Sequence, residues 1–72
     1  MTAEQMFNEL GYEKRIDFYD NEHFIEYQSK YVEEDYLVFC ISNVDYSSNL
    51  SRITIDIHKA ITQQMKELRW LD

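Results

Sequence analysis

The chain has 72 residues, the size of one small domain spanning residues 1–72, and a net charge of −7. Nucleic acids and anionic membranes are bound mainly through Lys and Arg, so this charge disfavours both and favours a basic protein partner. A single cysteine excludes an internal disulfide, and no apolar stretch approaches the ~20 residues that cross a bilayer. Together with a start that has no signal-peptide pattern, this predicts a cytoplasmic protein.

A short helix is predicted over residues 3–10. Thr2 and Gln5 have the spacing of a capping box, in which each side chain bonds the backbone of the other. The apolar residues then recur at helical spacing, at Ala3, Met6, Phe7 and Leu10. Gly11 follows at the position where a left-handed residue usually ends a helix.

From Tyr12 the apolar residues alternate with a period of two, which is typical of strands. In the first strand Ile16 and Phe18 are predicted on the half-buried side. A polar turn at residues 20–22 separates it from a second strand over 24–32, in which one face holds Ile25, Tyr27 and Tyr31.

A second polar turn at residues 33–35 leads to a third strand, Tyr36–Ile41, which is apolar on both faces. Such strands are usually covered on both sides, so we expect a helix, a loop or another subunit over the second face. Val44 and Tyr46 allow a short fourth strand.

The last element is predicted as a helix over residues 55–70, with Thr54 as its N-cap. Its buried stripe is formed by Ile57, Ile61, Gln64, Leu68 and Leu71. Short connections favour an antiparallel meander of three or four strands with both helices on one face. The predicted fold is therefore a two-layer α+β domain, flanked in sequence by an N-terminal and a C-terminal helix.

Three segments, residues 2–12, residues 53–54 with 58–61, and residues 64–71, resemble a group of short proteins encoded by phages and prophages of Gram-positive bacteria. The group has no assigned activity, and its usual ending has glycine before the tryptophan where this chain has Arg69. The resemblance implies an accessory phage or prophage protein in a bacterial cytoplasm. It implies no mechanism and no functional residues.

No motif of catalytic, metal or cofactor chemistry is found. Cys40 lies in an apolar run, where burial makes a thiol inert. The cluster of Asp20, Glu22 and His23 lacks the spacing of a metal loop and is interpreted as a solvated turn. Since Gly11 is the sole glycine, a glycine-rich phosphate loop is excluded. We therefore expect a protein that is not an enzyme and needs no cofactor.

Acidic residues are concentrated in residues 1–51, which hold eleven acids and three bases. Carboxylates on strands and turns imitate the phosphates of DNA, and tyrosines are enriched in interfaces. The predicted partner-binding residues are Asp17, Asp20, Glu22, Glu26, Glu33, Glu34, Asp35, Tyr19 and Tyr27. The leading hypothesis is an acidic module that engages a basic, nucleic-acid-binding protein of the host or phage.

Two alternatives remain open. The acidic residues are also typical of a surface that only keeps a small protein soluble. In the other alternative the chain is a structural domain that forms a homodimer through the second apolar face of Tyr36–Ile41, together with Trp70.

Overall fold

The capping box at the start of the chain begins the first helix, α1 (Ala3–Glu9). The Thr2 hydroxyl oxygen accepts the Gln5 amide at 3.1 Å, and the Gln5 side chain accepts the Thr2 amide at 2.8 Å. Gly11 follows with a φ of +92°, a conformation that favours glycine because it has no Cβ. This predicted helix is confirmed, and it ends one residue earlier than expected.

The computed structural model describes residues 1–19 and 22–71, without the side chains of Phe18 and Tyr19. Its strands are β1 (Tyr12–Tyr19), β2 (Glu22–Ser29), β3 (Tyr36–Cys40) and β4 (Asp45–Ser48), followed by the second helix, α2 (Ile55–Glu67). The strands form one antiparallel sheet in the order β1-β2-β3-β4. The predicted α+β meander is confirmed, and the fourth strand exists.

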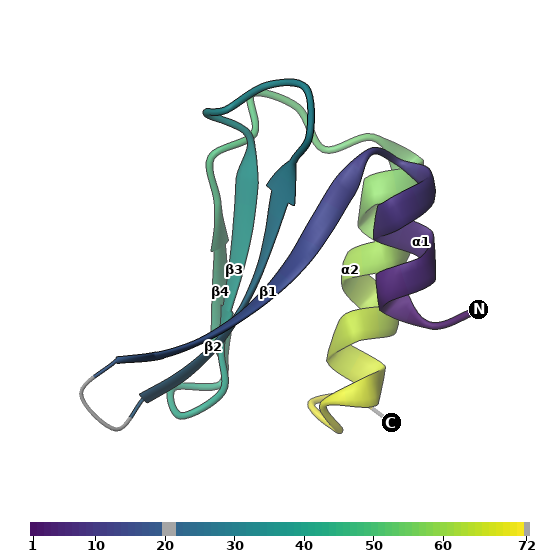
Figure 1. The fold of residues 1–72 in the computed structure, drawn as a ribbon. Helices are drawn as coiled ribbons and strands as arrows, with labels where there is room; N and C mark the ends of the chain where they lie inside the picture. The colour runs from purple at the N-terminus through teal and green to yellow at the C-terminus, as the bar shows by residue number, and fades with distance from the viewer. Residues whose placement is uncertain (20–21, 72) are drawn as a thin grey trace.

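Both helices cover the same face of the sheet and leave the other face open (Figure 1). The core between the two layers is rich in aromatic rings, and Phe7 stacks on Tyr27 with ring centroids 4.0 Å apart. Its buried residues are Ala3, Phe7, Tyr12, Ile25, Tyr27, Leu37, Phe39, Ile57, Ala60 and Ile61. Large rings thus give this small domain much of its buried area.

Two predictions about the first hairpin are wrong. Ile16 is 56% exposed, because the β1–β2 hairpin leans away from the helices toward its tip (Figure 1). The second strand ends at Ser29, whose hydroxyl oxygen accepts the amides of Tyr31 and Val32 and turns the chain. Tyr31 is therefore 83% exposed and does not share the buried face of Tyr27.

The last helix ends three residues earlier than predicted, at Glu67. Arg69 adopts a left-handed φ of +62°. Its amide donates to the Lys66 carbonyl at 3.0 Å, and the Trp70 amide donates to the Met65 carbonyl at 2.9 Å. These two bonds form a Schellman motif, which ends a helix. Leu71 consequently lies outside the helix and is 43% exposed.

Candidate interaction surface

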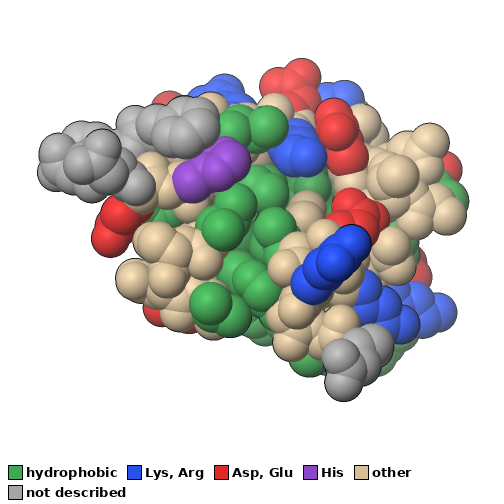
Figure 2. Space-filling model, turned by 90° about the horizontal axis from the view of Figure 1, so that it is seen from below, with side chains coloured by type: hydrophobic (Ala, Val, Ile, Leu, Met, Phe, Trp, Pro, Cys, Tyr) green, Lys and Arg blue, Asp and Glu red, His purple; other side chains and the backbone are tan. Residues whose placement is uncertain are grey.

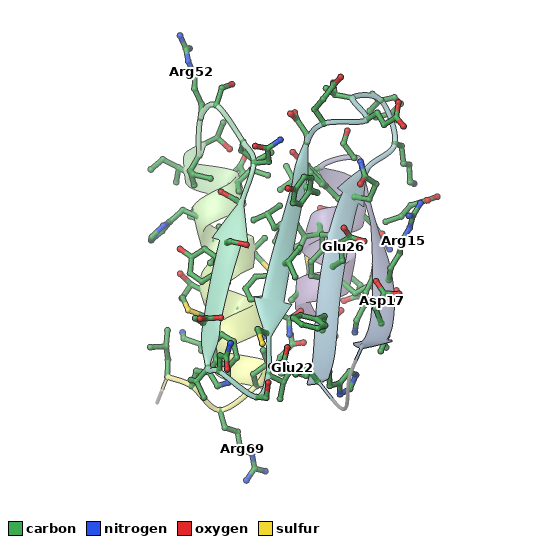
Figure 3. All side chains as sticks on the ribbon, turned by 90° about the vertical axis from the view of Figure 1, so that its left-hand side faces the viewer. Arg15, Asp17, Glu22, Glu26, Arg52 and Arg69 are labelled. Atoms are coloured by element: carbon green, nitrogen blue, oxygen red, sulfur yellow. The ribbon has the colours of Figure 1, made fainter. Side chains whose placement is uncertain are left out.

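The sheet face opposite the helices is accessible across all four strands, and Figure 3 looks directly onto it. Strand alternation and the pairing register place a defined set of side chains on this open sheet face. The described members are Glu13, Arg15, Asp17, Glu22, Phe24, Glu26, Gln28, Tyr36, Val38, Cys40, Asp45 and Ser47. Five of them are carboxylates and one is a guanidinium, so the face is acidic.

Four of these carboxylates form a staggered row along the first hairpin. Glu13 and Asp17 on β1 lie opposite Gln28 and Phe24, whereas Glu26 and Glu22 on β2 lie opposite Arg15 and Tyr19. Each of these four cross-strand pairs on the open sheet face therefore carries one carboxylate, and β1 and β2 supply it alternately. Successive carboxylates are about 7 Å apart along the strand direction, since each residue advances about 3.3 Å. We call this set the carboxylate row.

Apolar side chains occupy the middle of the open sheet face, but their neighbours cover much of their surface. Phe24, Tyr36 and Val38 are half-buried, and Cys40 is 6% exposed. In the described part of the chain no helix or loop segment lies over this side of β3 (Figure 3). The expectation that a helix or a loop covers the second face of this strand is therefore wrong. The predicted burial of Cys40 is confirmed, and its Sγ lies 3.4 Å from the Ser42 hydroxyl.

The predicted acidic turn of residues 33–35 lies between β2 and β3, at the end of the sheet away from the β1–β2 hairpin tip. Glu33 and Glu34 are exposed and Asp35 is half-buried. The Gln28 amide donates to the Glu33 carbonyl at 2.7 Å, which ties the turn to the open sheet face. The structure therefore separates these three acids from Asp17, Glu22 and Glu26, which it brings together in the carboxylate row.

Tyr27 does not belong to any accessible surface, which corrects its prediction as a partner-binding residue. Its side chain is fully buried on the helix-facing side of β2, and its hydroxyl donates to Gln64 of α2. Burial, with smaller contributions from Glu4 and Glu67, raises the pKa of Tyr27. Asp20 and the Tyr19 side chain, also predicted, lie outside the described residues.

Three charged members of the open sheet face were missed by the sequence prediction: Glu13, Arg15 and Asp45. The period of two from Tyr12 already groups Glu13 and Arg15 with Asp17, and that signal was available in the sequence. Arg15 also lines a shallow polar hollow of about 360 Å³ together with Gln28, Ser29, Lys30, Tyr31 and Glu33. The acidic face thus contains one cation, which lies between Glu13 and Asp17 and opposite Glu26.

Comparisons with protein-family models, curated proteins and solved structures found no match to this chain. The resemblance to phage and prophage proteins therefore stays a prediction. Within residues 1–19 and 22–71, no three metal-binding side chains gather closely enough to hold an ion. In the same residues, neither helix is long and apolar enough to cross a membrane. The carboxylate row is the feature on which a functional hypothesis can be built.

Proposed function

We propose that this chain is a non-enzymatic interaction module whose open sheet face binds a basic surface on a protein partner. The observation that carries the proposal is the carboxylate row, four regularly staggered acids on an accessible sheet. In keeping with the resemblance described above, the module acts as a phage or prophage accessory protein in a bacterial cytoplasm.

The two faces of the molecule differ in charge. The open sheet face carries five described carboxylates and one cation, whereas the two helices carry four acids, Glu4, Glu9, Asp56 and Glu67, against two lysines, Lys59 and Lys66. A surface of one sign speeds association with an oppositely charged partner and orients it on approach. The excess of negative charge is larger on the sheet, so a basic partner is directed more strongly to the sheet than to the helices.

The most suitable partner is a protein that binds nucleic acid. Such proteins neutralise regularly spaced phosphates with Lys and Arg, and much of their affinity comes from these contacts. Carboxylates repeated about every 7 Å along two strands offer the same kind of negative, evenly spaced array. Occupation of the partner's nucleic-acid site by this face is the expected consequence.

A homodimer through the second face of β3 has less support. Its side chains Tyr36 and Val38 are half-buried by their neighbours, so little apolar area is left for a partner copy. The large apolar side chains that are well exposed, such as Val44, Ile55 and Leu71, lie elsewhere. The charged character of the open sheet face is therefore the better guide to its function.

The test compares two variants with the same change in net charge. One neutralises the row with Glu13→Gln, Asp17→Asn and Glu26→Gln; the control neutralises helix-layer acids with Glu4→Gln, Glu9→Gln and Asp56→Asn. Binding to a basic DNA-binding protein of a bacterial host is measured by fluorescence anisotropy, with duplex DNA as competitor. We expect the row variant to bind about tenfold or more weakly, and the control to stay within about twofold.

Salt and competition complete the test. The wild-type affinity should fall as salt rises, because the contacts are electrostatic, and duplex DNA should displace the chain. Equal weakening in both variants would show that net charge alone matters and would reject the carboxylate row as the binding site. Affinity that is indifferent to salt would reject the electrostatic proposal altogether.

A further inference from the structure

A second surface lies at the end of the molecule where β3 turns into β4 and where α2 stops. Large apolar side chains are exposed there: Val44 at 59%, Tyr46 at 44% and Leu71 at 43%. Figure 2 looks onto this end and shows a continuous area of hydrophobic side chains between the two layers. We call this surface the apolar end, with Val44, Tyr46, Trp70 and Leu71 as its members.

The apolar end is fixed to the core. Phe39, which is fully buried, stacks on Tyr46 with ring centroids 5.4 Å apart, and its centroid lies 6.3 Å from that of Trp70. One core ring thus contacts both β4 and the segment after α2. Tyr46 and Trp70 are therefore held in place before any partner arrives, which lowers the entropy cost of binding.

Backbone strain borders the same surface. Val44 has a φ of +57° and Arg69 a φ of +62°, and no other described non-glycine residue has a positive φ. A β-branched residue in this conformation is a genuine outlier, since its Cβ crowds the backbone. Strain of this kind persists where the surrounding structure holds it and is common at functional sites.

Charges at the rim of the apolar end have opposite net signs on its two sides. The sheet side carries Glu22 and Asp45, whereas the helix side carries Lys66 and Arg69 with one acid, Glu67. Figure 3 shows Glu22 on the sheet and Arg69 projecting beyond the last helix at the same end. A two-fold axis running between the layers exchanges the two sides, so the acids of one copy face the bases of the other.

We propose that the apolar end joins two copies of this chain in a symmetric homodimer. Trp70 and Tyr46 lie in the dry centre of the contact, and Glu22 of each copy faces Arg69 of its partner. The self-complementary rim is what selects a second copy over an unrelated protein. Only Glu22 and Asp45 of the open sheet face take part in the contact, so Glu13, Asp17 and Glu26 of the carboxylate row stay accessible for the proposed binding of a basic protein.

The direct test is the mass in solution as a function of concentration. Sedimentation equilibrium should show the mass rising from 8.8 kDa toward twice that value as the concentration increases to about 100 μM, because small interfaces give weak dimers. Trp70 is the only tryptophan, so its emission should shift to shorter wavelength over the same range. A monomer throughout that range would overturn the proposal.

Matched variants locate the contact. Leu71→Asp places a charge in the apolar end and should abolish the dimer, whereas Ile53→Asp serves as its control. Ile53 is exposed to the same extent, 44% against 43% for Leu71, but precedes α2 at the opposite end. Loss of the dimer in the control with retention in Leu71→Asp would overturn the assignment.

A charge exchange tests the rim. Glu22→Arg and Arg69→Glu should each weaken the dimer about fivefold or more, because each places like charges across the axis. The double variant restores both opposite-charge pairs and should regain most of the lost affinity. A double variant no tighter than either single variant would overturn the pairing and with it this geometry of the dimer.

Discussion

The hydroxyl of Tyr27, in the middle of the sheet, donates a 2.5 Å hydrogen bond to the side-chain oxygen of Gln64 on α2. Both side chains are buried, with 0% and 3% of their surface exposed. This bond is a polar link between the two layers. Because a buried polar group without a partner is costly, the two residues depend on each other.

Replacing Tyr27 by Phe should lower the free energy of unfolding by about 1–3 kcal/mol, because Gln64 then stays buried without its donor. The double variant Tyr27→Phe with Gln64→Met should recover part of this loss, since no polar group is left unpaired. Urea unfolding followed by circular dichroism measures both effects. Tyr31→Phe, at an exposed ring, is the control and should change little. Equal loss in Tyr31→Phe would contradict the explanation.

Stability should decrease at alkaline pH. Burial raises the pKa of Tyr27 above its usual value of 10.0, and burial together with Asp35 also raises the pKa of Tyr12. Above pH 10 the unfolded chain therefore loses these protons more readily than the folded chain, so the free energy of unfolding falls as pH rises. Below pH 10 the stabilising contribution of these two tyrosines to the free energy of unfolding is fully present.

The measurement is urea unfolding between about pH 8 and 11, where linkage makes the slope visible. Tyr27→Phe removes one of the two groups and should give a shallower decline, with the remainder due to Tyr12. A decline as steep as that of the wild type would show that Tyr27 does not contribute.

Glu67 joins the two helices at their ends. Its carboxylate stands at the end of α2 but accepts the backbone amide of Ala3, the first residue of α1, at 2.7 Å, and Gln63 at 2.9 Å. A negative charge is favourable at a helix N-terminus, where amides lack partners. Glu67→Ala should cost about 1–2 kcal/mol, as the loss of a cap does.

Glu67→Gln is the informative comparison, because it keeps an acceptor oxygen and removes the charge. It should cost less than Glu67→Ala, and the difference should shrink in high salt. Thermal unfolding measures both variants. Identical losses at all salt concentrations would mean that the charge at the start of α1 is unimportant.

Arg69→Gly should stabilise the chain by about 1 kcal/mol. Arg69 occupies the left-handed position of a Schellman motif, where glycine avoids the clash of a Cβ with the backbone. Arg69→Ala removes the charge but keeps the Cβ, so it should give no such gain. Chemical unfolding at a low protein concentration separates this effect from dimer formation. A similar gain in both variants would assign the effect to charge.

Local features of the sequence were the predictable part of this fold. Thr2, Gln5 and Gly11 mark the ends of α1 because the bonds and dihedral angles involved lie within a few residues. The helical spacing of Ile57, Ile61 and Gln64 gave the buried side of α2, since an amphipathic stripe must face the core.

Features that depend on distant contacts were not predictable in the same way. The residues around Arg69 have the spacing of a continuing helix, yet the chain turns there and Trp70 packs near Phe39, which is far away in sequence. Tyr27 was predicted at an interface because its residue type suits one, but the helices cover its side of β2. The alternation that places Tyr27 on one face with Ile25 already indicated this side, and the residue type was given too much weight.

The sequence by itself determined the order of the elements and the excess of acids in residues 1–51. It also determined which residues of each strand alternate onto the same face. Only the tertiary structure decided that the carboxylates of β1 and β2 form one staggered row and that Val44, Tyr46 and Leu71 are exposed at one end of the molecule. The reason is that alternation sorts side chains onto two faces, whereas strand register and helix placement decide which side chains become neighbours and which face meets solvent.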